Sequence, residues 1–252
     1  MSSLFTNIIT MKLFAPALLT MIFFGPASAQ DSHVDLKITH LKDSFFVYTT
    51  YQNYGGNPFP SNSMYLVTSE GIVLFDTPWD STQFQPLADS LMERHGKKVV
   101  LCIATHFHDD RTAGLEFYRR QGAATYTSLK TRTLCRKHNM KEPKFIFVND
   151  TVFSMGGYRF EAYYPGWGHS EDNIVVWFPS AKILYGGCLI KSVENSSMGN
   201  IADANLESWP DAIEKLKRRF HGIEWVIPGH FAWSGKEALD HTLKLVKQAK
   251  KK

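Results

Sequence analysis

Two hydrophobic periodicities alternate along the chain, one typical of strands and one typical of helices. The continuous apolar run Val99–Ala104 predicts a strand buried on both faces. Apolar residues at helical spacing over Phe84–Leu91, followed by Gly96, predict a helix that ends at that glycine. Two more helices are expected at residues 114–120 and 128–138. The chain therefore combines both kinds of element.

Short strand patterns occupy much of the remaining chain. They lie at residues 64–68, 72–75, 145–148, 151–153, 158–163, 174–178, 182–185 and 223–227. Near the C-terminus, Ser208–Asp211 and Ser234–Glu237 have the spacing of capping boxes, which predicts two further helices. Strand-rich halves interleaved with helices predict an α/β fold in which two sheets pack face to face and the helices lie outside.

The composition is that of an ordinary globular protein. Of the 252 residues, 44% are hydrophobic and 21% are charged, so the chain can bury a sizeable core. The formal net charge is +4, and the 28 basic residues are spread along the sequence except for a lysine-rich tail at 247–252. Such a tail is typical of a solvated helix end, and we expect no nucleic-acid partner.

The first thirty residues have the features of a targeting segment. Lys12 provides a short basic region, an apolar stretch follows at Leu13–Phe24, and Ala27–Ala29 fits a cleavage site. The stretch is too short and too interrupted to span a membrane, so no stable membrane insertion is expected. We predict a signal peptide at residues 1–29 and one periplasmic domain at residues 30–252. A buried N-terminal helix is the alternative interpretation.

The clearest chemical signal lies directly after the buried strand. The sequence Thr105–Arg111 places His106, His108 and Asp110 at alternate positions on a loop that leaves the strand end. Such spacing can aim three side chains at one point, and imidazole and carboxylate both suit zinc. Two alternating histidines alone would be typical of a hydrogen-bonded loop. The added carboxylate favours a metal site.

Three further candidate ligands follow apolar strands at glycine-rich turns. His169 lies in a Gly-Trp-Gly-His turn, Cys188 follows two glycines and His230 follows Pro-Gly. Each alone would more often be structural, because a lone buried cysteine usually acts as a small hydrophobe. The chain has three cysteines, and an odd number in an exported protein leaves at least one thiol free. A ligand role for Cys188 would account for that thiol, while Cys102 and Cys135 are expected to be structural.

Together these motifs resemble the metallo-β-lactamase superfamily. The resemblance spans nearly all of the chain after residue 76 and rests on His-x-His-x-Asp at 106–110, Gly-His at 168–169, Gly-Gly-Cys at 186–188 and Pro-Gly-His at 228–230. It implies an αβ/βα four-layer sandwich with the metal site at one edge, between the sheets. Cys188 and Arg111 resemble the residues that subclass B1 has at these positions. Members of that subclass hydrolyse the β-lactam ring of penicillins, cephalosporins and carbapenems and so give antibiotic resistance.

The resemblance also implies a site with two zinc ions. Carried over position by position, one ion would be bound by His106, His108 and His169, and the other by Asp110, Cys188 and His230. The metals would activate the water that attacks the lactam carbonyl. Asp110 would orient that water in addition to binding metal, and no protein nucleophile is required.

Further residues match family positions near the substrate. Lys191 is similar to the residue that binds the carboxylate of the drug nucleus. Asn200 is similar to the residue that helps to polarise the lactam carbonyl, although an asparagine after glycine is also typical of an ordinary turn. Asp76 would hold a ligand in place, or it would be a turn carboxylate at a strand end. Arg111 would neutralise charge beneath the carboxylate–thiolate site, or it would pair at the surface.

The resemblance implies a small-molecule β-lactam as the partner, bound by a monomer. Residues 51–61 match a mobile flap between strands, whose Tyr54 and Phe59 would cover an apolar drug side chain; a plain hairpin loop is the alternative. A thioesterase or lactonase of the same superfamily and a zinc-storage protein are rival functions. Cys188, Lys191 and the predicted signal peptide argue against the first rival. Open coordination positions in the ligand set argue against the second.

Overall fold

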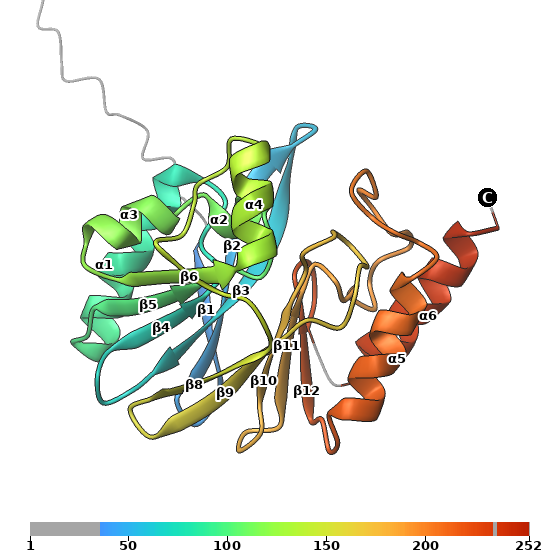
Figure 1. Cartoon of the computed structure of the whole chain (residues 1–252). Coiled ribbons are helices and arrows are strands. Elements are labelled where there is room, and N and C mark those ends of the chain that lie inside the picture. The colour runs from blue at the N-terminus through green and yellow to red at the C-terminus, as the bar shows by residue number, and fades with distance from the viewer. Residues whose placement is uncertain (1–35, 234–235, 252) are drawn as a thin grey trace, which may run out of the picture. The chain divides into compact units, whose positions relative to one another are not determined.

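Two sheets packed face to face make up the centre of the fold (Figure 1). The computed structural model describes residues 36–233 and 236–251. The predicted signal peptide and Ser234 of the second capping box lie outside the described residues. Apolar side chains from both inner faces form the main core, among them Phe75 from one sheet and Val176 and Phe178 from the other.

The first sheet has seven strands that are neighbours in chain order. They are β1 (Lys37–Lys42), β2 (Phe45–Tyr54), β3 (Asn57–Val67), β4 (Ile72–Phe75), β5 (Val99–Ile103), β6 (Ala124–Ser128) and β7 (Phe145–Phe147). Strands β1 to β4 are antiparallel, and β4 to β7 are parallel. Parallel neighbours need crossover connections, which include α1 (Phe84–His95), α2 (Asp109–Thr112), α3 (Leu115–Arg120) and α4 (Leu129–Lys137).

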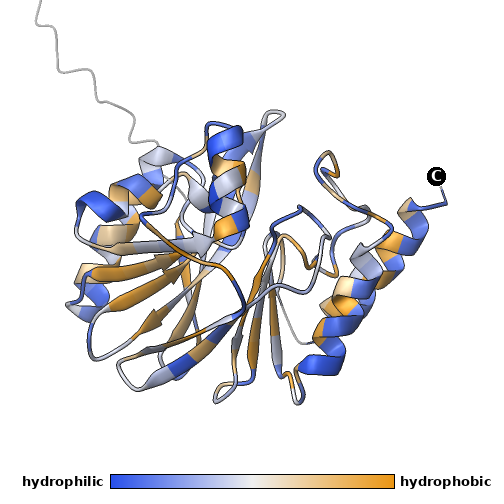
Figure 2. Ribbon diagram, in the orientation of Figure 1, coloured by the Kyte–Doolittle hydropathy of each residue, from blue (hydrophilic) through white to orange (hydrophobic). Residues whose placement is uncertain are grey.

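The second sheet has five strands in the order β12-β11-β10-β9-β8. They are β8 (Thr151–Met155), β9 (Tyr158–Tyr163), β10 (Val175–Phe178), β11 (Ile183–Gly187) and β12 (Trp225–Pro228). Helices α5 (Trp209–Arg219) and α6 (Glu237–Ala249) cover its outer face, where Trp209 and Val246 pack with Leu184. Figure 2 shows hydrophobic residues concentrated along the strands, with polar residues on the outer sides of the helices. The order helices, sheet, sheet, helices confirms the predicted four-layer sandwich.

The flap predicted at residues 51–61 is a hairpin of paired strands rather than a loop between strands. Strands β2 and β3 stay in register as far as Tyr54 opposite Asn57, so only Gly55 and Gly56 form the turn. Both glycines have positive φ, 60° and 85°, as a two-residue hairpin turn of this kind requires. The paired strands therefore project past the ends of their neighbours β1 and β4, and they carry Phe59 and the 65% exposed Tyr54 with them.

The capping box predicted at Ser208 is wrong. Helix α5 does begin one residue later, but the Ser208 hydroxyl donates to the carbonyl oxygen of Trp167 (2.7 Å) and accepts nothing from the helix. Asn205 Oδ1 accepts the backbone N–H of Ser208 instead (3.1 Å). A tertiary contact to the β9–β10 connection has taken the hydroxyl that local spacing assigned to the helix.

Candidate metal centre

All six predicted ligands come together at one edge of the sandwich. The carboxyl ends of neighbouring parallel strands meet at the same edge of a sheet, and most of these residues follow such an end. The loop and short helix after β5, the β9–β10 connection and the segments after β11 and β12 supply, in that order, His106, His108, Asp110, His169, Cys188 and His230.

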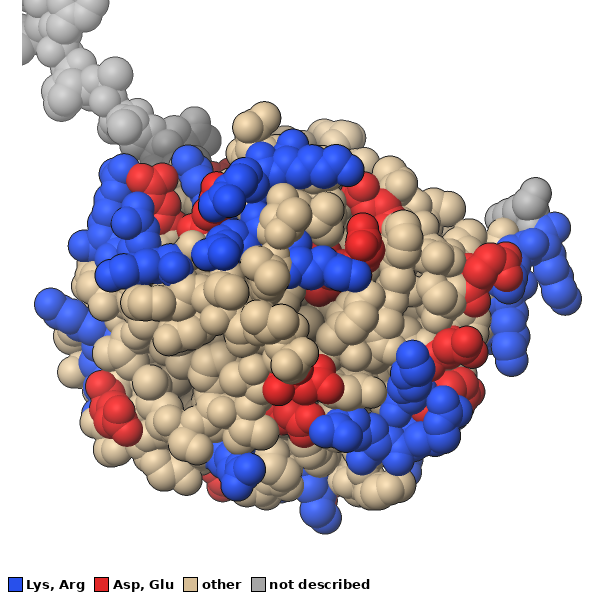
Figure 3. Space-filling model, in the orientation of Figure 1, with Lys and Arg blue, Asp and Glu red and all other residues tan. Residues whose placement is uncertain are grey.

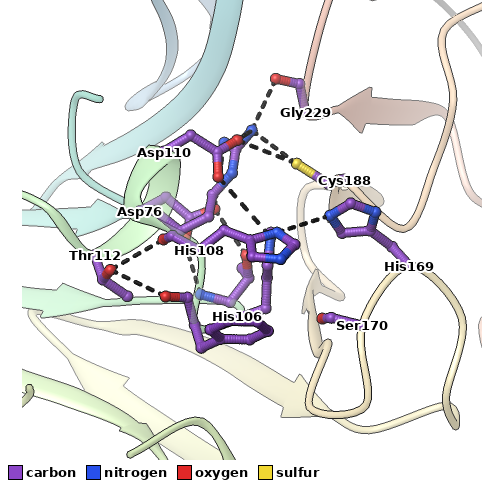
Figure 4. Close-up of polar contacts among 12 residues, drawn as sticks. Asp76, His106, His108, Asp110, Thr112, His169, Ser170, Cys188 and Gly229 are labelled. Carbon is purple, nitrogen blue, oxygen red and sulfur yellow. Dashed lines mark hydrogen bonds and ion pairs between the residues drawn. The ribbon is translucent and has the colours of Figure 1, made fainter. Parts of the chain in front are cut away.

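The ring nitrogens of three histidines form the first group (Figure 4). His108 Nδ1 lies 3.1 Å from His106 Nε2 and 3.1 Å from His169 Nε2. Burial, reinforced by nearby positive charge, holds the pKa of His106 and of His169 well below the usual range, so both rings are neutral at pH 7. One cation at the point where the nitrogens converge would accept a lone pair from all three neutral rings at once. The three nitrogens therefore fit metal coordination.

A thiol, a carboxylate and an imidazole form the second group. Cys188 Sγ lies 3.4 Å from Asp110 Oδ2 and 3.2 Å from His230 Nε2, and these last two atoms are 3.3 Å apart. Burial raises the pKa of Cys188 to about 12, although Arg111 opposes the shift. A coordinated cation would hold the thiol deprotonated. This set of nitrogen, oxygen and sulfur donors fits zinc.

Arg111 lies fully buried beneath the second group. Its Nη2 donates to Cys188 Sγ (3.0 Å) and pairs with Asp110 Oδ2 (2.9 Å), while Nη1 donates to the carbonyl oxygen of Asn62 (2.7 Å). Burial opposes ionisation of Asp110, but the charge of Arg111 and the hydrogen bond from His230 act together against it, and the pKa of that carboxyl lies well below its usual range. Arg111 therefore lies where it can neutralise charge beneath the site, and it does not pair at the surface.

Asp76 is buried beneath the loop that carries the first histidines. Its carboxylate accepts the backbone N–H (2.6 Å) and the hydroxyl (2.9 Å) of Thr105, the residue before His106. Burial raises the pKa of Asp76 to about 6, and Arg111 opposes the shift. Asp76 has no hydrogen bond to any of the six candidate ligands, all of which the structure describes, so it acts by holding the loop in place.

Asp203 is a site residue that the sequence analysis missed. His108 Nε2 donates to Asp203 Oδ2 (3.0 Å), which leaves Nδ1 free to face the other two histidines. The Trp167 indole donates to the Asp203 carbonyl oxygen (2.8 Å) and anchors that loop. A carboxylate that orients a histidine in this way is a common partner of a metal ligand. No local pattern marks Asp203, because it lies 95 positions from His108 in the sequence.

A cavity of about 280 Å³ opens onto both groups. Lys191 and Asn200, the two candidate substrate-binding residues, both line it. Lys191 is buried, its Nζ lies 5.4 Å from the centre of the Trp209 ring, and burial lowers its pKa. Asn200 is exposed, and its Oδ1 accepts the backbone N–H of Ala202 (3.0 Å). The turn contact and the cavity position of Asn200 therefore coexist.

A two-sheet sandwich with these six side chains at its edge defines a metallohydrolase class, and known proteins identify the family. The model of the metallo-β-lactamase superfamily matches residues 56–230. The chain is 40% identical over 218 residues to a type 2 metallo-β-lactamase of Elizabethkingia meningoseptica. The match covers 86% of this chain and 88% of the relative. It is also 40% identical over 223 residues to metallo-β-lactamase IND-1 of Chryseobacterium indologenes, with coverage of 88% and 92%.

Solved structures agree with the sequence relatives. A metallo-β-lactamase from Pontibacter korlensis has a TM-score of 0.82 at 38% identity, covering 84% of this chain and 99% of that chain. Metallo-β-lactamase IND-7 has a TM-score of 0.82 at 40% identity, with coverage of 84% and 98%. The chain belongs to the metallo-β-lactamase superfamily, and the resemblance to subclass B1 that its sequence indicated is confirmed.

Proposed function

We propose that this chain is a zinc-dependent β-lactamase, which hydrolyses the cyclic amide of penicillins, cephalosporins and carbapenems and so gives antibiotic resistance. The observation that carries the proposal is the convergence of three histidines and the Asp110–Cys188–His230 group beside a cavity that Lys191 lines. Relatives that share 40% of their residues and bear the name metallo-β-lactamase support it.

Two zinc ions are proposed as the cofactor. When bound, zinc lowers the pKa of water to about 7 and polarises a carbonyl group. The converging neutral imidazoles support one ion, and the carboxylate–thiol pair above Arg111 supports the other. The proposed ligands are His106, His108 and His169 for the first ion, and Asp110, Cys188 and His230 for the second.

The protein's own side chains would bind and orient the substrate. The Lys191 ammonium binds the carboxylate of the drug nucleus, and the Asn200 amide donates to the lactam carbonyl oxygen. Asp110 is held in its anionic form by Arg111, so its carboxylate can accept a hydrogen bond from the attacking water and orient it. Arg111 has no contact with substrate in this scheme and stabilises the anionic side chains from below.

Hydrolysis of a carbapenem, followed by its ultraviolet absorbance, tests the proposal. The purified chain should hydrolyse the drug, a chelator should abolish the activity, and added zinc should restore it. A thioester and a lactone serve as comparison substrates, because the rival functions predict a preference for them. Zinc-loaded protein that leaves both a penicillin and a carbapenem intact would exclude the proposed function and favour zinc storage or one of those hydrolases.

We also propose export to the periplasm, with a signal peptide at residues 1–29 and a monomeric domain at residues 30–252. The basic region, apolar stretch and Ala27–Ala29 site support export. Among the described residues, no helix combines the length and the apolarity needed to cross a membrane. Light scattering on the purified protein gives the oligomeric state, and a mass near 25 kDa is expected for the processed monomer, at about 110 Da per residue.

A further inference from the structure

Phe231 follows the candidate ligand His230 and has a backbone conformation that favours glycine. Its φ is 63°, in the left-handed region, which a bulky side chain seldom adopts. Such strain persists only where surrounding contacts impose it, and it is common at functional sites. The turn after β12 therefore holds an aromatic residue where glycine would be more stable.

Asn62 imposes this conformation on the turn. Its side-chain Nδ2 donates to the carbonyl oxygens of Phe231 (2.7 Å) and Pro228 (3.1 Å), and its backbone N–H donates to that of Gly229 (2.8 Å). The Thr49 hydroxyl donates to Asn62 Oδ1 (2.9 Å) and fixes the orientation of the amide. The three hydrogen bonds from Asn62 tie the turn to the β2–β3 hairpin and so determine where the Phe231 ring lies, while the bond from Thr49 stays within the hairpin.

The Phe231 ring completes an aromatic wall of the cavity. It packs against Phe59 of the hairpin in a T-shaped pair, with ring centres 5.0 Å apart. Phe59 also contacts Trp79 and Tyr54, at 6.4 Å and 5.8 Å between ring centres. We call Tyr54, Phe59, Trp79 and Phe231 the aromatic wall; all four line the same cavity as Lys191. The wall draws on three segments that are far apart in the sequence.

We propose that Phe231 is a specificity-determining residue that favours β-lactams whose acyl side chain carries an aromatic ring. The inference rests on the proposed function and adds a substrate class to it. Aromatic rings pair edge-to-face and gain stabilisation beyond the burial of their surface, so an aryl group gains more from this wall than a small alkyl group does. Lys191 binds the carboxylate that all these drugs share, and Phe231 distinguishes among their side chains.

Three variants of Phe231 separate the role of its ring from the strain of its backbone. Phe231→Ala removes the ring and keeps the strain, Phe231→Gly removes both, and Phe231→Tyr keeps both. KM is measured for a penicillin with a phenylacetyl side chain and for one with an acetyl side chain. We expect the alanine and glycine variants to raise KM about three- to tenfold for the phenylacetyl penicillin only. The tyrosine variant should stay near wild type.

Melting temperature gives the second readout. Phe231→Gly should melt about 2–4 °C above Phe231→Ala, because only glycine relieves the left-handed backbone. Asp43 is the matched control, since it has a φ of 49° in the exposed β1–β2 turn, at the other end of β2 from the hairpin tip. Asp43→Gly should melt above Asp43→Ala by a similar amount, and neither variant should change KM.

The outcomes distinguish the two proposals. Equal KM changes on both penicillins, or unchanged KM in Phe231→Ala and Phe231→Gly, would overturn the role of Phe231 while the β-lactamase function stands. Wild-type protein with no activity on either penicillin would overturn the proposed function, and this inference with it. Selective loss with the phenylacetyl substrate, together with the melting order of glycine above alanine, supports the inference.

Discussion

Arg111 is the residue that allows two acidic side chains to lie buried next to each other. Its guanidinium contacts Asp110 and Cys188, and it lies 3.6 Å from the carboxylate of Asp76. A buried anion that loses its partner destabilises a protein by about 3–5 kcal/mol. The candidate metal centre therefore depends on a residue that touches neither the proposed substrate nor the converging histidines.

Replacing Cys188 tests the assignment of ligands between the two proposed ions. In Cys188→Ser, a neutral hydroxyl replaces a thiolate, so the second group should lose its metal while the three histidines retain theirs. Metal analysis of the purified variant should find about one zinc per chain where the wild type holds about two. Cys135→Ala is the control, since that buried cysteine lies on α4, outside the site. Two zinc ions in Cys188→Ser would contradict the assignment.

Replacing Lys191 tests how the substrate carboxylate is bound. The contact is the same in the ground state and the transition state, so Lys191→Ala should raise KM about tenfold or more and leave kcat nearly unchanged. Lys191→Glu should be worse, because like charges repel. Lys244→Ala, an exposed lysine on α6, is the matched control. The Lys191 variants should lose little efficiency on an analogue that has no carboxylate. Equal losses on both substrates would mean that Lys191 does not bind this group.

At the scale of elements, close packing places the β9–β10 connection that carries His169. A Cβ added to Gly168 would lie 2.3 Å from Leu189 Cδ1, closer than real Cβ atoms approach, and 3.0 Å from the Trp209 ring, which is a tight contact. Leu189 and Trp209 are both buried, so a side chain at residue 168 must displace these neighbours or the connection itself, and we expect His169 to move with the connection.

The variant Gly168→Ala should lower both stability and zinc affinity. Overpacking of this kind costs about 1–3 kcal/mol, and the displaced His169 weakens the three-histidine group. Calorimetric titration with zinc measures the affinity. Gly122→Ala is the control, because it is strained by a φ of 100° but has open space around it in the α3–β6 turn. It should lower the melting temperature and leave zinc binding unchanged; a normal zinc affinity in Gly168→Ala would show that the loop position does not matter.

At the scale of the whole molecule, the proposed ligands join the two halves of the sandwich. His106, His108 and Asp110 come from the first sheet, whereas Cys188 and His230 come from the second. Figure 3 shows basic side chains interspersed with acidic ones on the visible face. Exposed ion pairs such as Arg136–Glu142 contribute little to stability. A metal ion that binds both halves is expected to contribute more.

Zinc should therefore stabilise the folded chain. A ligand at about 100 times its dissociation constant adds about 2.7 kcal/mol, which corresponds to about 5–10 °C in melting temperature for a chain of this size. Thermal denaturation of chelated and zinc-loaded protein measures the shift. Cys188→Ser should show a smaller shift than the wild type, because one of its two groups no longer binds metal. An equal melting temperature with and without zinc would contradict a structural link through the metals.

Export predicts the N-terminus of the mature protein. Cleavage after Ala29 should leave a chain that begins at Gln30, because small residues at positions 27 and 29 fit the signal-peptidase site. Intact-mass measurement of the exported protein decides the point. A mass that retains Met1 would show that the segment is not removed.

The sequence alone predicted the fold class, which the structure confirms, and the six candidate ligands, which the structure brings together. Local periodicity predicted β5 and the helix after Phe84, and the His-x-His-x-Asp spacing indicated the metal site, because such signals depend only on neighbouring residues. The identity of each side chain as nitrogen, oxygen or sulfur donor also needs no tertiary structure.

Contacts between distant segments were decided only by the tertiary structure. Asp203 orients His108 across 95 positions, and the Ser208 hydroxyl turns from its own helix to the Trp167 carbonyl oxygen. The backbone strain at Phe231 arises from hydrogen bonds to Asn62, 169 positions away. In each case packing brings together groups whose separation along the chain leaves no local pattern, so the partner of a polar group becomes known only once the chain is folded.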